Sequence, residues 1–495
     1  MYKPSLEEFL KLSRKANVIP VYKEISADLD TPVSSYLKMK KGDYAFLLES
    51  VEGQEKIARY SFLGANPCLV FTSKGRNIKI ISRDKKQSRS FQTASDPLTE
   101  IKKLMKDFKA ADVKGLPRFY GGFVGYIGYD MVRFFEDIPD KNPDDLGLAD
   151  SVFMLTDTIL LFDHVNHNIK IICNSFLPCG KNISDKEKTK IYHKAIENIE
   201  EINKDFNLSF EEKKTKRAKA AVKNITSNFQ KSEFCSIVDK AKEYIRKGDI
   251  IQVVLSQRFK IKTQKDPFDI YRDLRSLNPS PYMFFLKLKD FILVGSSPEM
   301  LVRCENGILE ARPIAGTRRR GTNDLEDSKL AKELLQDKKE RAEHVMLVDL
   351  ARNDLGRVAK TGNVTVGEFM RVERYSHVMH IVSDVTAELN PKNDAYDVLR
   401  ACFPAGTVSG SPKIRAMEII DELENTRRGP YAGCVGYFSF SQNMDTCITI
   451  RTIVIKGNTA YIQAGAGIVL DSIGENEYLE SINKAKALVE AINRN

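Results

Sequence analysis

The sequence contains no tryptophan, and its eight cysteines are scattered without a C-x-x-C pair or another close metal-type spacing. We therefore expect reduced thiols, as in a cytosolic protein, and neither a disulfide framework nor a zinc site. No apolar run reaches the roughly 18 residues that a membrane span requires, since the best run, residues 152–162, is interrupted by Thr156, Asp157 and Thr158. The first residues, MYKPSLEEFLKL, are too acidic for a signal peptide. The sequence predicts a soluble cytoplasmic protein.

The chain also lacks the clustered basic and aromatic residues that are typical of a nucleic-acid-binding surface. Its formal net charge is +10, and much of the excess lies between Lys181 and Lys231, where lysines alternate with glutamates without interleaved aromatic residues. This pattern is typical of a solvated helix and connector. We therefore expect no nucleic-acid or membrane partner, whereas the positive charge favours small anionic ligands.

Strand-like and helix-like segments follow one another in irregular order, without the regular β–α repeat of a parallel sheet. Hydrophobic residues make up 42% of the chain and charged residues 29%, so a large core is available and disorder is not expected. The sequence predicts a mixed, mainly antiparallel α+β protein. A change in composition divides it into an N-terminal region (1–207), a charged connector (208–230) and a C-terminal region (231–495).

Local signals predict individual elements within these regions. Asp96 and Pro97 are typical of a helix N-cap and first helical position, and apolar residues follow them on one face. Residues 152–163 and 445–455 are each expected to form a single strand, and residues 325–352 one helical stretch.

Two short segments are candidates for binding an anion. The segment RPIAGT (312–317) is expected to form a bend in which a backbone N–H and the Thr317 hydroxyl face an anion, although a solvated basic turn is an equal alternative because three arginines follow (Arg318–Arg320). Small and hydroxylated residues at 406–411 precede a helix, where they predict either an anion cradle or an ordinary helix N-terminus.

Carboxylates cluster in two segments that are expected to be helical. Glu340 and Glu343 lie in the first, and Glu475, Glu477 and Glu480 open the last helix, where residues three apart share a face. Two such helices facing each other would offer the oxygen ligands that Mg²⁺ prefers. Solvated glutamates at helix N-termini are the alternative.

The segment Gly465-Ala-Gly467 ends an apolar strand, where glycines allow either a close approach of the backbone to a carboxylate ligand or a bulge. His380 lies on another strand in an apolar background. A histidine in this setting is more often a core residue than a catalyst.

Six long motifs in the C-terminal region occur in the order that is known from chorismate-utilising enzymes, and from about Glu233 onward the chain resembles that family. The motifs are RPIAGTRRRG (312–321), AEHVMLVDLARND (342–354), FPAGTVSGSPK (403–413), GYFSF (436–440), IRT (450–452) and QAGAGIVLDS (463–472). The N-terminal region, including LLES (47–50), resembles the corresponding part of anthranilate synthase component I. The resemblance implies a large mixed, mainly antiparallel β-sandwich core with helices packed outside, a regulatory and core-contributing region at 1–207 and a chorismate-binding catalytic region at 231–495.

Two residues distinguish the reactions within this family. Members that add water resemble one another in carrying a lysine where this chain has Gln252, and an amide cannot deprotonate water. Aminodeoxychorismate synthases typically carry a lysine nucleophile where this chain has Ala315. The resemblance therefore implies addition of ammonia to chorismate followed by loss of pyruvate, the anthranilate synthase reaction. Aminodeoxychorismate synthase, which does not always carry the lysine, is the alternative enzyme, and a non-catalytic basic binding protein is the alternative from another class.

The resemblance also implies a set of site residues. Chorismate is expected at Gly316, Thr317, Tyr437, Arg451, Gly465, Ala466, Gly467 and Lys484. Mg²⁺ is expected at Glu343 and Glu480, with Glu340 and Glu477 as near neighbours. Glu299 is the expected general acid, which requires a raised pKa, and His380 and Thr407 are candidates for assisting proton removal and pyruvate loss.

The chain has no G-x-C-x-G nucleophile elbow, since the nearest match, residues 432–436, begins with alanine. A separate glutamine amidotransferase subunit is therefore expected to supply ammonia, in a heterotetramer of two large and two glutaminase subunits. The resemblance further implies feedback inhibition by tryptophan, bound at Ser50, Pro281, Tyr282 and Met283.

Overall fold

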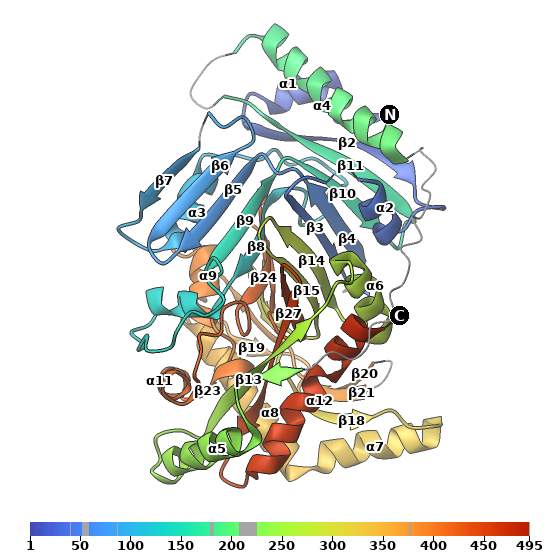
Figure 1. Cartoon of the computed structure of the whole chain (residues 1–495). Helices are drawn as coiled ribbons and strands as arrows, with labels where there is room; N and C mark the ends of the chain where they lie inside the picture. The colour runs from blue at the N-terminus through green and yellow to red at the C-terminus, as the bar shows by residue number, and fades with distance from the viewer. Residues whose placement is uncertain are drawn as a thin grey trace.

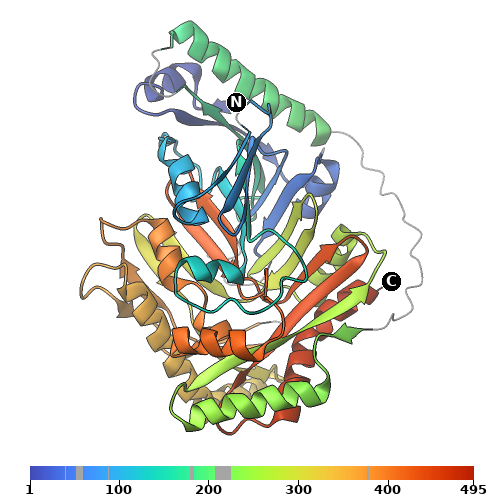
Figure 2. The ribbon, with the colours of Figure 1, turned by 60° about the vertical axis from the view of Figure 1, so that its left-hand side comes forward.

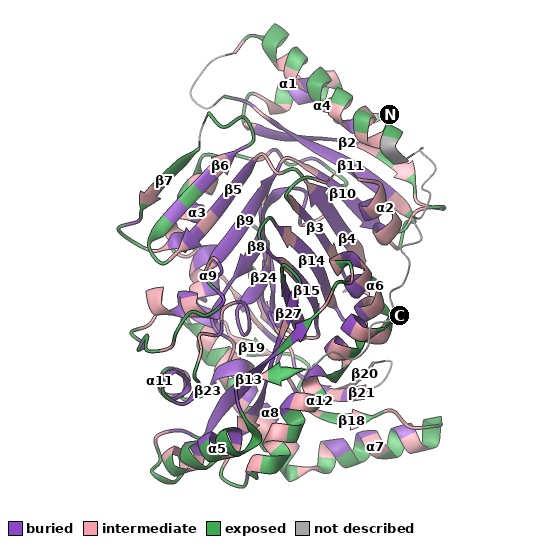
Figure 3. Ribbon diagram, in the orientation of Figure 1, coloured by how far each residue is buried: buried purple, intermediate pink, exposed green. Residues whose placement is uncertain are grey.

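Two large antiparallel sheets form the centre of the molecule, and helices pack around them (Figure 1). The computed structural model describes residues 1–39, 41–51, 59–86, 88–178, 183–206, 225–375 and 378–494. This arrangement confirms the predicted α+β fold. Buried residues follow the strands and exposed ones the outer helices (Figure 3). No helix in the described ranges is long and apolar enough to cross a membrane.

The first sheet contains strands from both ends of the chain. In spatial order they are β1 (Tyr2–Lys3), β2 (Val18–Ser26), β11 (Asn168–Phe176), β10 (Thr158–Asp163), β4 (Tyr60–Ala65), β3 (Tyr44–Glu49), β14 (Tyr282–Leu288), β15 (Ile292–Ser297), β26 (Thr452–Lys456), β27 (Thr459–Ile468), β13 (Gln252–Lys262) and β12 (Thr226–Ser227). The short strand β23 (Gly410–Ser411) also pairs with β13.

The second sheet is built in the same mixed way. Its order is β19 (Thr365–Val366), β22 (Val385–Glu388), β17 (Ile308–Ala311), β16 (Met300–Glu305), β25 (Met444–Ile448), β24 (Cys434–Ser439), β8 (Gly122–Ile127), β9 (Ser151–Thr156), β5 (Leu69–Lys74), β6 (Asn77–Ser82) and β7 (Arg89–Gln92). A separate small sheet has the order β18 (Ile314–Arg319), β21 (Val378–Val382) and β20 (Arg371–Arg374).

The helices lie mainly on the outside of these sheets. They are α1 (Leu6–Leu12), α2 (Pro32–Lys38), α3 (Pro97–Lys106), η1 (Tyr129–Phe134), α4 (Asp185–Phe206), α5 (Lys231–Arg246), α6 (Pro267–Leu277), α7 (Asp324–Gln336), α8 (Lys338–Gly356), α9 (Ala395–Cys402), α10 (Gly406–Ser409), α11 (Lys413–Leu423) and α12 (Gly474–Asn493). Helix α4 lies at one end of the molecule, and α5 lies at the opposite end beside α12 (Figures 1 and 2).

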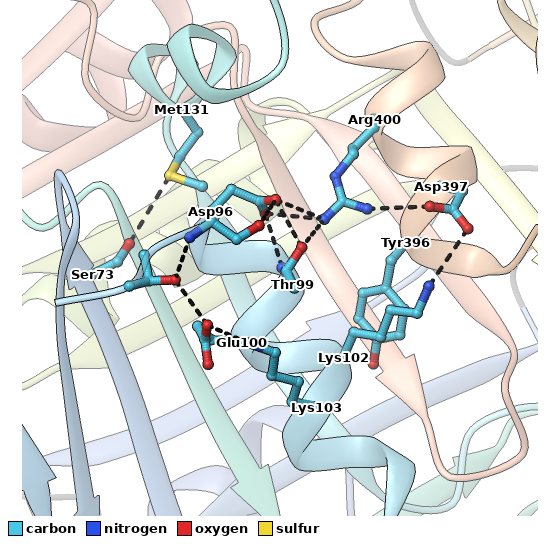
Figure 4. Close-up of polar contacts among 12 residues, drawn as sticks. Ser73, Asp96, Thr99, Glu100, Lys102, Lys103, Met131, Tyr396, Asp397 and Arg400 are labelled. Atoms are coloured by element: carbon cyan, nitrogen blue, oxygen red, sulfur yellow. Dashed lines mark hydrogen bonds and ion pairs between the residues drawn. The ribbon is translucent and has the colours of Figure 1, made fainter. Parts of the chain in front are cut away.

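The N-terminal and C-terminal regions share both sheets. Strand β3 pairs with β14 in the first sheet, and β8 pairs with β24 in the second. Helices α3 and α9 are also joined, because the Arg400 guanidinium donates to the Asp96 carboxylate at 3.0 and 3.1 Å and to the Thr99 hydroxyl at 2.8 Å (Figure 4). Asp96 caps α3 as predicted, by accepting from the Thr99 backbone N–H. Most of the proposed connector, 208–230, lies outside the described residues.

The two segments that were each expected as one strand instead change sheets. Residues 151–163 divide at Asp157 into β9 and β10, and residues 444–456 divide between Thr449 and Arg451 into β25 and β26. In both places the apolar pattern resumes after only a few residues that are mostly polar, because the chain is buried on either side of the break. Periodicity alone therefore does not reveal the crossing.

Two further expectations were wrong. The helical stretch 325–352 consists of α7 and α8, separated at Asp337, whose carboxylate accepts from the first-turn N–H of Glu340 at 3.2 Å. Residues 314–319 form the strand β18 and not a bend. The pairing of β18 with β21 is irregular between Ala315 and Thr317, where Gly316 adopts φ +68°.

Candidate active site

The end of strand β27 lies against Gln252, the first residue of β13. A Cβ atom on Gly467 would lie 2.4 Å from the Gln252 Nε2 atom, so the glycine leaves room for the amide. The Gln252 amide also lies close enough to the Glu343 carboxyl group on α8 to oppose the rise of its pKa. Strands β27 and β13 and helix α8 therefore bring together three groups: the segment Gly465–Gly467, which we call the glycine cradle, the Gln252 amide and the Glu343 carboxyl group.

Two cationic side chains face this cradle. The Lys484 ammonium of α12 donates to the Gly465 carbonyl at 3.0 Å and pairs with the Glu480 carboxylate at 2.7 Å. The Arg451 guanidinium donates to the Lys484 carbonyl at 2.8 Å, and within the described ranges it has no ion pair with a carboxylate. Burial lowers the pKa of Arg451, but arginine stays charged at neutral pH. Arg451 and Lys484 thus provide positive charge for an anionic ligand.

Glu299 lies in the turn between β15 and β16. Its backbone carbonyl accepts from the Ile448 N–H at 3.1 Å, which ties the turn to the end of β25. Part of the residue remains accessible, yet burial of the carboxyl group raises its pKa to about 8, with smaller opposing contributions from Thr407 and Lys484. A carboxyl group with this pKa is protonated at neutral pH and can act as a general acid.

A small cavity of about 50 Å³ joins Glu299 to Thr407 on α10. Its wall includes Arg312, Asp354 and Cys402. The buried Thr407 hydroxyl lies near Glu299 but forms no hydrogen bond of good geometry within the described residues. An unpaired buried hydroxyl is available to a ligand or to water.

Two pairs of carboxyl groups lie on α8 and α12, Glu340 with Glu343 and Glu477 with Glu480. The pKa of Glu343 is raised by burial and by the charge of Glu340, and the pKa of Glu477 is raised by burial and by the charge of Glu480. The Lys339 ammonium of α8 lowers the pKa of both Glu343 and Glu477, so both carboxyl groups lie within range of one positive charge.

The donor chemistry of this acidic site fits Mg²⁺. Glu343 and Glu477, each with a raised pKa beside a second carboxyl group, would be stabilised by a cation. Mg²⁺ takes one or two protein carboxylates with water and substrate oxygens. Across the described part of the chain, no group of three or more acidic, histidine or cysteine side chains is close enough to hold a metal without such additional ligands. Glu340 is engaged elsewhere, because it accepts from the Arg318 guanidinium at 3.1 Å.

The irregular pairing in β18 brings Gly316 and Thr317 next to His380 of β21. The His380 Nδ1 atom lies 2.9 Å from the Gly316 carbonyl and 3.1 Å from the Thr317 hydroxyl. Because a carbonyl only accepts, Nδ1 carries the proton in the neutral ring and Nε2 is unprotonated. Burial lowers the pKa of His380, so the ring is neutral at neutral pH. His380 is thus able to accept a proton at Nε2.

The three arginines that follow Thr317 are all ion-paired. Arg318 binds Asp337 at 2.7 Å, Arg319 binds Glu326, and Arg320 binds Asp327 at 2.8 Å. They attach β18 to α7 and α8. The alternative of a solvated basic turn is therefore wrong.

Tyr437 does not lie with the other residues expected to bind chorismate. It lines a second cavity of about 60 Å³, and its hydroxyl accepts from the Arg118 guanidinium at 3.1 Å. The tyrosine that reaches the glycine cradle is Tyr431, whose hydroxyl would lie 3.0 Å from a Cβ atom on Gly465. Tyr431 was not among the residues expected at the site, and no local pattern in the sequence distinguishes it.

All four residues expected at the inhibitor site line this second cavity. Ser50, Pro281, Tyr282 and Met283 surround it together with Arg118 and Asp445. The buried Ser50 hydroxyl has no hydrogen-bond partner among the described residues. The Asp445 carboxylate accepts from the Tyr282 hydroxyl at 3.0 Å. The cavity thus offers hydrogen-bond donors and acceptors beside aromatic side chains.

Comparisons with known proteins show the family to which the chain belongs. The profile of the chorismate binding enzyme family matches residues 44–490. Anthranilate synthase component 1 of Acetivibrio thermocellus is 50% identical, over 99% of either chain, and that of Aquifex aeolicus (strain VF5) is 51% identical, over 99% of this chain and 97% of the relative. The crystal structure of anthranilate synthase component I from Streptococcus pneumoniae TIGR4 superposes with a TM-score of 0.76 at 37% identity, covering 94% of this chain and 99% of that one. The chain belongs to the chorismate-binding enzymes and, within them, to the anthranilate synthase component 1 family.

Proposed function

We propose that this protein is the large subunit of an anthranilate synthase, which converts chorismate and ammonia to anthranilate and pyruvate in tryptophan biosynthesis. The observation that carries the proposal is the pair Gln252 and Ala315. Gln252 lies between the Glu343 carboxyl group and Gly467, and Ala315 lies buried in β18 beside Gly316. Neither side chain can attack the ring or activate water, so the site is suited to an external nucleophile.

Chorismate is a dianion, and the residues of the cradle can hold both of its charges. Arg451 and Lys484 provide positive charge beside Gly465 and Gly467, and Thr317 provides a hydroxyl. We add Tyr431 to this set and remove Tyr437, because only the Tyr431 hydroxyl reaches the cradle. Fixed donors of this kind orient the ring before reaction and so lower the entropic part of the barrier.

The first chemical step is addition of ammonia at ring carbon C2 with loss of the C4 hydroxyl. Glu299, protonated at neutral pH, donates its proton to the departing hydroxyl, which leaves as water. The added nitrogen loses a proton, which restores the acid. In the second step a base removes the proton at C2, the C3–O bond breaks, the enolate that leaves takes up a proton to become pyruvate, and the ring becomes aromatic. His380, with an unprotonated Nε2, and Thr407 are the candidates to assist this step.

Glu343 and Glu480 would hold Mg²⁺, with Glu340 and Glu477 nearby. The bound ion would supply a Lewis acid for the ring carboxylate. A cation would stabilise these carboxyl groups, because burial and a neighbouring carboxylate raise the pKa of Glu343 on α8 and of Glu477 on α12.

Ammonia is proposed to come from a glutamine amidotransferase subunit. The relatives' names, component 1, imply a partner component, and the sequence has no G-x-C-x-G elbow of its own. A heterotetramer of two large and two glutaminase subunits is the proposed assembly. Tryptophan is the proposed inhibitor, at the cavity that Ser50 and Met283 line.

Purified protein, assayed with chorismate, Mg²⁺ and ammonium salt at alkaline pH, tests the proposal. We expect anthranilate, detected by its fluorescence, to form without any glutaminase. Accumulation of a 4-amino product without fluorescence would reassign the protein to aminodeoxychorismate synthesis. A folded protein that consumes no chorismate would favour a non-catalytic binding protein.

A further inference from the structure

A fully buried ion pair lies behind the proposed chorismate site. Glu424, the C-cap of α11, and Arg428, four residues later, have side chains that are 3% and 1% exposed. The Arg428 guanidinium donates to the two Glu424 carboxylate oxygens, from Nη2 at 2.6 Å and from Nε at 3.0 Å. Such a pair is stable in the interior only when further hydrogen bonds satisfy both partners.

These further bonds reach the strand that supports the glycine cradle. The Arg428 Nη2 group donates to the Val254 carbonyl at 2.7 Å, and the Glu424 Oε1 atom accepts from the Ser256 N–H at 2.9 Å and from its hydroxyl at 2.8 Å. In the pairing of β13 with β27, Val254 lies opposite Gly467 and Ser256 opposite Gly465. The ion pair therefore holds the two β13 residues on which the cradle rests.

Arg428 also reaches two other walls of the site. Its Nη1 group donates to the Val408 carbonyl at 2.7 Å, one residue after Thr407 on α10. The guanidinium lies 5.5 Å from the centroid of the Tyr431 ring and 4.8 Å from that of Tyr129, within the range of cation–π contact. One side chain thus contacts β13, α10 and the tyrosine that reaches Gly465.

We propose that the Glu424–Arg428 ion pair is a positioning device for chorismate, which sets the spacing of the Gly465–Gly467 cradle, the Thr407 segment and Tyr431. This inference rests on the proposed function. Neither residue touches the substrate, and their effect passes through the groups that they hold. Arginine is required at 428 because its planar fork serves two carbonyls and a carboxylate at once, whereas an ammonium cannot match that geometry.

Arg428→Lys tests this role, with Arg400→Lys as a matched control. Arg400 is also an arginine held by carboxylates and a hydroxyl, between α9 and α3 (Figure 4), and it contacts neither β13 nor Tyr431. Both variants should lower the melting temperature. Only Arg428→Lys should raise the KM for chorismate, by about tenfold or more, because displaced donors weaken ligand binding. The KM for ammonia should stay within about twofold.

A second readout does not depend on turnover. Chorismate should raise the melting temperature of the parent protein, and Arg428→Lys should need about tenfold more chorismate for the same shift. Glu424→Gln, which keeps size and hydrogen bonding, should show an intermediate effect. Unchanged chorismate affinity in Arg428→Lys, or an equal loss in Arg400→Lys, would overturn the proposal. A parent that binds chorismate but makes no anthranilate would overturn only the proposed function.

Discussion

Glu299 shows how a single environment can determine a chemical role. Its carboxyl group lies in the turn between two strands of different sheets, and burial raises its pKa to about 8. In water the same group would be ionised at neutral pH and could not donate a proton. The proposed acid therefore depends on the closed surroundings that the two sheets create.

Replacing Glu299 by glutamine should lower kcat with ammonia by about 10²–10⁴-fold, because an amide keeps the shape but cannot transfer a proton. The KM for chorismate should change little. Steady-state kinetics over a range of pH would measure both values. A kcat within about threefold of the parent value, much less than the loss expected for a general acid, would remove Glu299 from the mechanism.

Glu299→Gln should also change how the free energy of unfolding depends on pH. Between the ordinary carboxyl pKa of 4.5 and about 8, the folded parent keeps a proton on Glu299 that the unfolded chain has released. The parent should therefore lose stability as pH rises through this window, with no further loss from this group above it. Glu299→Gln lacks this contribution, so its unfolding free energy relative to the parent should rise across the window. Urea unfolding at several pH values checks the sign.

Ala315 is informative because it has no reactive group. Ala315→Lys should block or divert the ammonia reaction by placing an amine beside the ring. Ala315→Met, which has similar length and no amine, controls for crowding in β18, where Ala315 is 8% exposed. Anthranilate formation should be at least about tenfold lower in the lysine variant than in the methionine variant. Equal rates would show that Ala315 does not face the substrate.

The sequence did not predict which tyrosine reaches the cradle. Tyr431 and Tyr437 lie six positions apart, and only the pairing of β24 with β8 directs Tyr437 toward the second cavity. The Glu424–Arg428 pair was also missed. Two oppositely charged residues four apart normally indicate a solvated pair, and nothing local reveals that both are buried here just after the end of α11.

At the scale of elements, the hairpin of β14 and β15 connects the two cavities. In this hairpin Tyr282 lies opposite Ser297 and Met283 lies opposite Ser296. The two serines precede Glu299 by two and three residues. The Ser297 hydroxyl donates to the Ile448 carbonyl at 2.7 Å. A ligand that displaces β14 would therefore also displace the turn that carries Glu299.

Ser50→Phe should weaken tryptophan inhibition by at least about tenfold, since the ring would fill a cavity of about 60 Å³. Uninhibited turnover should be largely unchanged. Ser35→Ala is the control, because Ser35 on α2 is another buried hydroxyl without a partner among the described residues and lies outside the cavity. Inhibition curves for both variants provide the measurement. Equal sensitivity of Ser50→Phe and the parent would remove tryptophan from this cavity.

Elements were predictable where the local signal was complete. The Asp96 cap placed α3. Strands that change sheets were not predictable, since only three polar residues, 156–158, separate two buried apolar runs and do not reveal a change of sheet. Strand β18 was expected as a bend because its Pro and Gly residues resemble turn signals, although here they accommodate an irregular pairing.

At the scale of the whole molecule, the N-terminal and C-terminal regions are interleaved. The family motifs lie almost entirely after residue 231, yet β14 and β24 each depend on an N-terminal neighbour, β3 and β8. The proposed division at 208–230 thus separates regions of sequence that complete each other's sheets.

A fragment of residues 231–495 should not fold alone, because removal of residues 1–207 leaves β14 and β24 with open edges and exposes core side chains. We expect it to be insoluble, or to lack cooperative thermal unfolding by circular dichroism. Co-expression with residues 1–207 should restore a soluble complex. A monomeric, cooperatively folded and active 231–495 fragment would show that the shared sheets are dispensable.

The central claim is that ammonia adds to ring carbon C2 of chorismate at this site. It is tested most directly by incubating the purified protein with chorismate, Mg²⁺ and ¹⁵N-ammonium, and identifying the product by mass spectrometry and NMR. The account predicts ¹⁵N-anthranilate, with the label ortho to the carboxylate, and an equal amount of pyruvate. A product labelled para to the carboxylate, or one that carries oxygen in place of nitrogen, would contradict it.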